Sequence, residues 1–109
     1  MSTLPIGNQT VRTQYTGMST PVDTICEPDD TQATVKARHL ANVTDRWRTE
    51  PPVVDTQPHA FVTLEYVSGG EMVGTEMDQN PGEALLHYER RFLNTVAPAF
   101  FDSHPVDLG

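Results

Sequence analysis

The chain has 109 residues, which is enough for one small domain spanning 1–109. Its apolar content of 37% argues against a disordered chain. A membrane protein is excluded as well, because no apolar run approaches the ~20 residues that a spanning helix needs. Fifteen acidic residues against seven basic ones give a net charge of -8, which argues against nucleic-acid binding unless the basic residues are gathered in one place. The N-terminus lacks the charged start and apolar core of a signal peptide, so we expect the protein to begin here and to stay inside a cell.

The first part of the chain predicts short strands joined by turns. Residues 1–8 show no clear period and predict an N-terminal arm or a short strand. Residues 9–16 put Val11 and Tyr15 on one side and polar residues on the other, which predicts a strand. Residues 22–26 are a second strand candidate, and the flanking segments TGMSTP and EPDDTQ are typical of turns. No segment repeats along the chain.

The stretch ATVKARHLANVTDRWR, residues 33–48, holds four of the seven basic residues and one acid, so it carries +3 while the rest of the chain carries -11. All four cations occupy even positions, namely Lys36, Arg38, Arg46 and Arg48. On a strand they would project from one face. A helix is the alternative because Ala, Lys, Arg and Leu favour it, although a helix would scatter the four cations. The alternation and the β-branched residues favour a strand.

Beyond this stretch, three prolines in residues 49–58 predict a loop. Residues 59–67 give the clearest strand, with Ala60, Val62, Leu64 and Tyr66 on one face. Residues 68–79 are glycine-rich and predict a connection. The sheet region thus covers 9–67.

The last segment, residues 80–101, predicts a helical region. Asn80 is a candidate N-cap, Pro81 suits the first helical position, and Glu83 completes a capping box. An apolar stripe at helical spacing follows, formed by Leu85, Tyr88, Phe92 and Val96 and widened by Leu86 and Leu93. Pro98 is expected to end or kink this helix, with AFFDS as a second short helix.

No catalytic motif stands out, so we expect no enzyme, no cofactor and no small-molecule substrate. The four histidines lack metal-ligand spacing, which predicts no metal site. Cys26 is the single cysteine, which excludes an intrachain disulfide. A buried small hydrophobe is favoured over a reactive thiol at that position.

Two features remain, and each has two interpretations. The even-numbered face of 33–48 is either a solvated sheet surface or a surface where Lys and Arg contact phosphates while Asn42, Thr34 and Thr44 bond bases or sugars. The apolar stripe of the C-terminal helix packs either on its own sheet or against a second subunit.

The order of these elements resembles the coat protein of single-stranded RNA bacteriophages. The segments VKARH at 35–39 and GEALLHY at 82–88 are similar to segments in that family. The resemblance implies an α+β fold in which an antiparallel sheet is followed by one or two helices that pack on a partner subunit in an intertwined dimer. It also implies an icosahedral shell of such dimers around single-stranded RNA, a genomic RNA hairpin as ligand, and a virion assembled in the cytoplasm of a bacterial host.

Carried onto this chain, the resemblance assigns two groups of residues and one loop. The RNA-binding candidates are Lys36, Arg38, Asn42, Thr44, Arg46 and Arg48. The dimer-interface candidates are Leu85, Leu86, Tyr88, Phe92, Leu93, Phe100 and Phe101. The proline-rich loop 49–58 would lie between dimers, around the symmetry axes.

A second interpretation comes from a different class of protein. It is a small acidic interaction or adaptor protein, or a structural component of a DNA phage, without nucleic-acid binding. In that case the acidic surface is the functional one and the basic stretch is only solvated.

Overall fold

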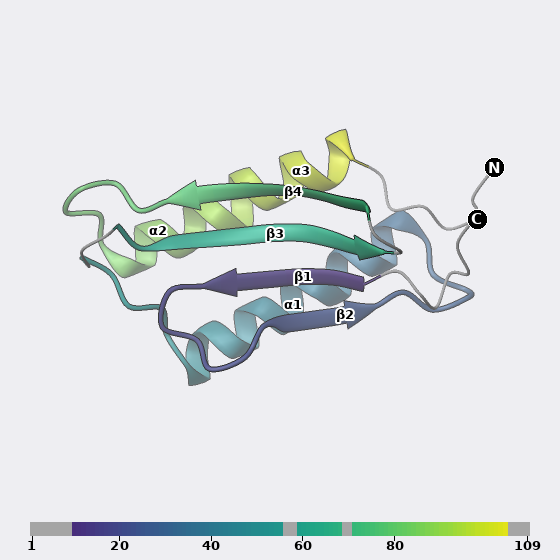
Figure 1. Ribbon diagram of the computed structural model, residues 1–109, viewed down its shortest axis with the longest axis horizontal. Helices are drawn as coiled ribbons and strands as arrows, with labels where there is room; N and C mark the ends of the chain where they lie inside the picture. The colour runs from purple at the N-terminus through teal and green to yellow at the C-terminus, as the bar shows by residue number, and fades with distance from the viewer. Residues whose placement is uncertain (1–9, 56–58, 69–70, 105–109) are drawn as a thin grey trace.

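Two hairpins, each followed by a helix, build the fold in the computed structural model, which describes residues 10–55, 59–68 and 71–104. The elements are β1 (Thr10–Tyr15), β2 (Val22–Ile25), α1 (Gln32–Thr49), β3 (Phe61–Ser68), β4 (Glu71–Asp78), α2 (Leu85–Arg91), η2 (Phe92–Val96) and α3 (Ala97–Ser103). The strands form one antiparallel sheet in the order β2-β1-β3-β4, and the helices lie together on one of its faces (Figure 1). The α+β class is confirmed, while the predicted arm at 1–8 lies outside the described residues.

The two ββα units meet at the pairing of their first strands, β1 and β3. In this register Val11 lies opposite Tyr66, and Tyr15 lies opposite Val62. Each first strand therefore carries the pattern Val-x-x-x-Tyr, and each valine faces the tyrosine of the other unit. The sequence shows no overt repeat, yet the structure repeats a ββα unit across the centre of the sheet.

Three of the predicted strands are confirmed. β1 and β2 form a hairpin. Gly17, in the turn that connects these two strands, has φ +101°, a conformation that favours glycine. β3 buries Val62 and Leu64 as its pattern predicts, and Ala60, directly before it, is buried as well. The glycine-rich connection predicted at 68–79 is wrong, because β4 occupies most of it and pairs with β3 along its length.

The strand predicted for 33–48 is also wrong, because this stretch forms the long helix α1. Its buried residues are Val35, His39, Val43 and Trp47, which recur every four positions. A spacing of four is twice the strand period and close to the 3.6 residues of a helical turn, so the odd-numbered apolar face fits both structures. The cations do not share a face on this helix.

The start of α1 carries a signal that separates helix from strand. Thr31 is the N-cap, and its hydroxyl accepts a hydrogen bond from the backbone N–H of Thr34 at 3.2 Å. The hydroxyl of Thr34 in turn accepts from the backbone N–H of Thr31 at 2.8 Å. This is a capping box with threonine at both positions, which fixes the first turn of the helix.

The C-terminal helix begins at Leu85, five residues later than the predicted cap at Asn80. Residues 80–83 form a turn instead, in which Glu83 N–H donates to the carbonyl of Asn80. The predicted capping pair still meets, because the Glu83 carboxylate accepts from the backbone N–H of Asn80 at 3.1 Å. The pair closes the turn that leads from β4 into α2.

The helix then runs without a break through η2 into α3. η2 is a π-helical turn, in which each hydrogen bond spans five residues: the N–H of Ala97 donates to the carbonyl of Phe92. Pro98 follows directly and has no N–H to donate. The wider turn accommodates this proline, so AFFDS continues the same helix instead of starting a separate one.

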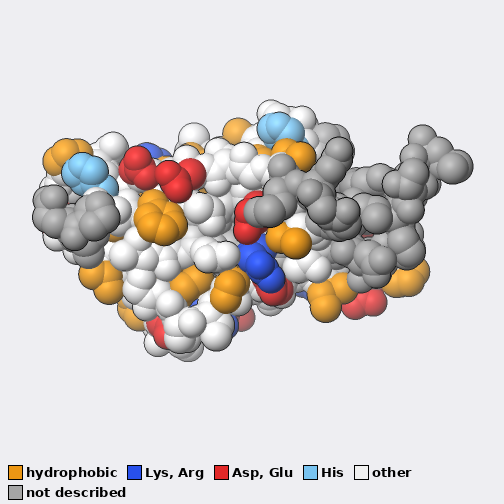
Figure 2. Space-filling view, viewed as in Figure 1, with side chains coloured by type: hydrophobic (Ala, Val, Ile, Leu, Met, Phe, Trp, Pro, Cys, Tyr) orange, Lys and Arg blue, Asp and Glu red, His pale blue; other side chains and the backbone are white. Residues whose placement is uncertain are grey.

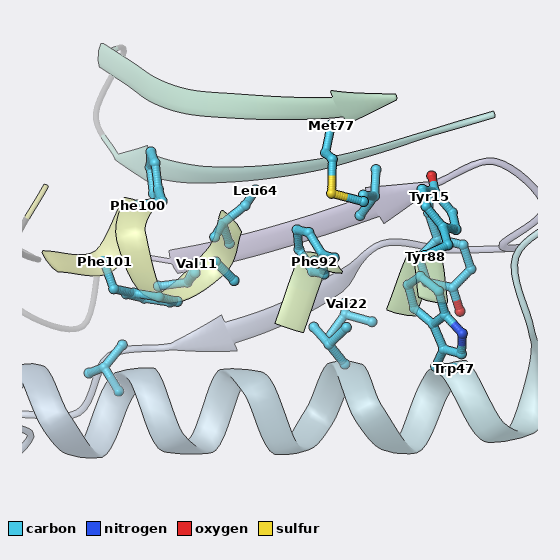
Figure 3. Packing of buried hydrophobic residues seen from close by; sticks show 14 of the residues in the cluster. Val11, Tyr15, Val22, Trp47, Leu64, Met77, Tyr88, Phe92, Phe100 and Phe101 are labelled. Carbon is cyan, nitrogen blue, oxygen red and sulfur yellow. The ribbon is translucent and has the colours of Figure 1, made fainter. Parts of the chain in front are cut away.

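The core lies between the sheet and its helices, as Figure 3 shows for Val11, Phe92 and Phe101. Trp47 of α1 and Tyr88 of α2 meet there with ring centroids 5.6 Å apart. Cys26 is fully buried, as expected for a small hydrophobe, and burial raises the pKa of its thiol.

A buried histidine fastens α1 to the sheet. His39 is fully buried, with Nε2 2.7 Å from the hydroxyl of Thr13 on β1 and Nδ1 2.8 Å from the hydroxyl of Thr24 on β2. Asn42 on the next turn of α1 donates a further hydrogen bond to Thr24 at 3.1 Å. Burial lowers the pKa of His39 to about 4, so the ring is neutral at neutral pH.

This histidine makes the stability of the fold depend on pH. Between pH 6.5 and about 4 the unfolded chain binds a proton that the folded chain excludes, so the free energy of unfolding falls as the pH falls. The loss from His39 reaches roughly 3 kcal/mol at the lower end. Urea unfolding at several pH values, compared between the wild type and His39→Gln, measures it. Equal pH dependence in both proteins would contradict the burial of a neutral ring.

Candidate interaction edge of the sheet

Two of the predicted RNA-binding residues are engaged in holding α1 to β2. Arg38 Nη2 lies 2.6 Å from a carboxylate oxygen of Asp30 and 2.8 Å from the carbonyl oxygen of Ile25, the last residue of β2. Arg46 donates at 2.8 Å to the carbonyl of Thr20, which precedes β2, and contacts Glu50 at 3.5 Å. The Arg38 guanidinium holds the pKa of the Asp30 carboxyl well below its usual range.

The remaining candidates are spread around the same helix. Lys36 faces Asp102 of α3 at 3.6 Å, whereas Arg48 is exposed and has no hydrogen bond or ion pair to a described residue. Asn42 donates to Thr24, and the hydroxyl of Thr44 donates to the carbonyl of Leu40. The six residues therefore do not form the single basic face on which the RNA argument depended.

The face of the sheet opposite the helices, here called the open face, carries acids rather than bases. Its charged side chains are Arg12, Asp23, Glu65, Glu76 and Asp78. Arg12 is its one cation among the described residues, and its Nε lies 2.7 Å from Asp23 on the neighbouring strand. Glu76 and Asp78 of β4 are exposed and form no ion pair with the described residues. Figure 2, which looks onto this face, shows few basic side chains over the strands.

The predicted dimer residues lie mostly inside the chain's own core. Tyr88, Phe92, Phe100 and Phe101 are buried against the sheet of the same chain. Leu85 and Leu93 are partly buried and pack on the same cluster. Leu86 differs, because 55% of its surface is exposed, and its role in a dimer stays a prediction. The resemblance assigned to a partner subunit a packing that the chain satisfies by itself.

The two edges of the sheet differ in length and in how they are closed. β2 has four residues, and the carbonyls at its end and just before it accept hydrogen bonds from Arg38 and Arg46. β4 has eight residues. Short edge strands and basic side chains over the edge prevent the addition of another strand. The β2 edge has both protections.

The direction of the β4 backbone groups follows from the register. Both backbone groups of Phe61 in β3 point to the β1 side: its carbonyl accepts from the N–H of Thr16 at 3.0 Å, and its N–H donates to the Thr16 hydroxyl at 3.1 Å. In an antiparallel ladder the N–H and C=O of one residue point to the same neighbour, and this direction alternates along the strand. Even-numbered residues of β3 therefore bond β4 through its odd-numbered residues. The N–H and C=O groups of residues 72, 74, 76 and 78 point away from the sheet.

At one end of this β4 edge an outward backbone group is hydrogen-bonded by a side chain, whereas further along the strand no described residue bonds the outward groups. Arg91 of α2 donates through Nη2 to the outward carbonyl of Asp78 at 2.6 Å. The same guanidinium binds both carboxylate oxygens of the buried Glu83, at 2.7 and 2.8 Å. These bonds lower the pKa of Glu83 to about 2, so the carboxylate stays charged. Gly74 and Glu76 make no outward backbone bond to a described residue.

A groove runs beside this open edge, between β4 and the C-terminal helix. It has a volume of about 390 Å³ and is lined by Thr75 of β4 and by Thr95, Val96, Ala99 and Phe100 of the helix. Val73, two residues before Thr75 and on the same face of β4, leaves 41% of its surface exposed. The open edge and the groove together are here called the β4 site.

A second groove lies at the β2 edge, with a volume of about 490 Å³. Its lining includes Asp23, Asn42 and Arg46, which already bond Arg12, Thr24 and Thr20 respectively. Although it is larger, these three polar side chains are already paired within the chain. The β4 site offers unpaired backbone groups and an apolar wall, so it is the stronger candidate.

Other kinds of site find no support among the described residues. They include no group of three His, Cys, Asp or Glu side chains arranged to hold a metal ion. None of the described helices has the length and apolar character to cross a bilayer. No protein-family model, curated protein or solved structure shows significant similarity to the chain.

Sequence reasoning missed the β4 site because the strand itself was missed. Residues 71–78, EMVGTEMD, contain a glycine and three acids, which are all poor strand formers. The alternation of Met72, Gly74 and Glu76 with Val73, Thr75 and Met77 is too weak to predict a strand. Its pairing with β3, a long-range contact, supplies what the local sequence lacks.

Arg38 and Arg48 test whether the cations of α1 are structural. Arg38→Met removes the bonds to Asp30 and Ile25 and is expected to lower the free energy of unfolding by on the order of 1 kcal/mol, because the guanidinium is partly solvated. Arg48→Met makes the same chemical change on the same helix and is expected to be nearly neutral. Urea denaturation compares the two, and equal losses would contradict the assigned role of Arg38.

Phe92 and Leu86 test the assignment of the C-terminal helix to the chain's own core. Phe92→Ala is expected to cost about 3–5 kcal/mol, whereas Leu86→Ala should stay within about 0.5 kcal/mol. Urea denaturation at two protein concentrations measures both. A larger, concentration-dependent loss for Leu86→Ala would show instead that the exposed stripe is a subunit contact.

Proposed function

We propose that this protein is a small acidic interaction protein that binds another protein by adding a strand of its partner to β4. One observation carries the proposal: β4 is a long edge strand, and the outward backbone groups of its residues Gly74 and Glu76 are bonded by no described residue. Strand addition is a common mode of peptide recognition, in which main-chain hydrogen bonds provide affinity. The groove next to Thr75 and Val96 provides a place for the partner's side chains.

The contrast with the β2 edge supports the same proposal. At that edge two arginines of α1 occupy the carbonyls of Thr20 and Ile25. At the β4 edge Arg91 bonds one outward carbonyl, that of Asp78, and the outward backbone groups of Gly74 and Glu76 make no bond to a described residue. An edge that serves no purpose would be expected to be blocked in the same way.

The RNA-shell prediction receives less support from this geometry. It depended on a basic sheet face at 33–48, and that stretch is a helix whose cations mostly contact the chain itself. The open face of the sheet has acids at Glu65, Glu76 and Asp78, which would repel phosphates. The interaction-protein interpretation needs neither a basic face nor a shell.

Photo-cross-linking in the cells that make the protein tests the proposal. A benzophenone amino acid at Val73 sits at the β4 site, and the same group at Leu86 sits on another exposed apolar position. We expect a discrete protein adduct from position 73 and none of the same mass from position 86.

A backbone variant supplies the control. In Glu76→Pro the proline removes an outward N–H without removing a bond to β3, so the fold should persist, as circular dichroism checks. The adduct at position 73 should disappear in this variant. An adduct that survives Glu76→Pro, or one that contains nucleic acid, would overturn the proposal.

A further inference from the structure

The geometry points to a partner segment whose side chains alternate between basic and apolar, and this inference rests on the proposed function. A strand added to β4 places alternate side chains on the two faces of the sheet. Partner residues opposite Gly74 and Glu76 project on the open face. The residues between them lie opposite Val73 and Thr75 and project over the groove. The two faces differ in character, so they select different side chains.

On the open face the β4 site selects positive charge. Glu76 and Asp78 are exposed, lie two residues apart on the same face and have no ion pair with a described residue. Glu65 of β3 lies on this face too, opposite Gly74. Gly74 presents no side chain, so a long basic residue opposite it can extend towards Glu65. Directly opposite side chains in a sheet lie about 5 Å apart, close enough for lysine or arginine to pair with these carboxylates.

On the helix face the β4 site selects apolar side chains. Thr75 of β4 lines the groove together with Val96, Ala99 and Phe100 of the helix, and Val73 lies next to it on the same face of β4. A valine or isoleucine in the partner strand would cover the exposed part of Val73. The described residues that line the groove include no aspartate, glutamate, lysine or arginine.

Charge also argues against a second copy of this chain as the occupant. Two copies of β4 would bring Glu76 and Asp78 of each chain to one seam, and each chain carries a net charge of -8. Like charges across paired strands destabilise the pairing. A basic partner converts the same carboxylates into favourable contacts.

Three seven-residue peptides test the inference by titration into the full-length chain, followed by amide NMR shifts and by calorimetry. The first alternates Lys and Val, the second alternates Glu and Val, and the third has the composition of the first with four Lys followed by three Val. We expect the first to shift the amides of β4, and the other two to bind at least tenfold more weakly.

Two variants connect the binding to the assigned groups. Glu76→Lys leaves the backbone intact and should weaken the Lys-Val peptide at least tenfold while strengthening the Glu-Val peptide. Glu76→Pro should abolish the binding of both alternating peptides. Arg48→Glu, a charge change away from the β4 site, should leave all affinities unchanged apart from a small uniform effect.

The outcomes separate the inference from the proposed function. If the Glu-Val peptide binds β4 as tightly as the Lys-Val peptide, strand addition stands and the basic partner is wrong. If neither alternating peptide shifts the β4 amides, strand addition itself fails. If the free chain forms a concentration-dependent dimer whose β4 amides are already protected, a second copy is the occupant and the inference is overturned.

Discussion

The antiparallel pairing of β1 with β3 is the constraint on which the rest of the structure depends. It joins two ββα units through their first strands, with Val11 opposite Tyr66 and Tyr15 opposite Val62. Because the first strands occupy the centre, the second strands become the two edges of the sheet. The described helices then all lie on the same face of the sheet (Figure 1). The positions of the core, the open face and the β4 site all follow from this one pairing.

The two units hold their helices to the sheet through different hydrogen bonds. As a result, most outward backbone groups of β4 make no bond to a described residue. In the first unit His39 bonds β1 and β2, and Arg38 and Arg46 bond the carbonyls beside β2. In the second unit Arg91, the last residue of α2, bonds Glu83 in the turn before the helix and the carbonyl of Asp78 at the end of β4. The cations of α1 therefore bond backbone carbonyls at the β2 edge, while Glu76 and Asp78 of β4 form no ion pair with a described residue.

Much of the fold was predictable from local sequence patterns. Strong alternation at 9–16 and 59–67 located two strands, and the apolar stripe located the C-terminal helix. The long helix α1 was not predicted, because Val35, His39, Val43 and Trp47 recur at a spacing that fits a strand and a helix alike. The Thr31–Thr34 capping box would have favoured the helix, but threonine is less recognisable than glutamate at the third position.

The β4 site was less predictable than the fold, for a physical reason. An open edge is a property of the order of strands, and this order is set by contacts between residues far apart in the sequence. The sequence showed an acidic chain with a basic stretch, and charge alone pointed to the basic stretch as the functional part. Lys36, Arg38 and Arg46 lie beside acidic partners, whereas Glu76 and Asp78 of β4 are among the charges without an ion pair to a described residue.

Amide hydrogen exchange of the free chain, read residue by residue by NMR, tests the open edge most directly. The account predicts an alternation along β4, with slow exchange at Val73, Thr75 and Met77, which bond β3, and fast exchange at Gly74 and Glu76. Uniformly slow exchange along β4 would contradict it, because the outward N–H groups would then already be bonded and the β4 site would not be free to receive a partner.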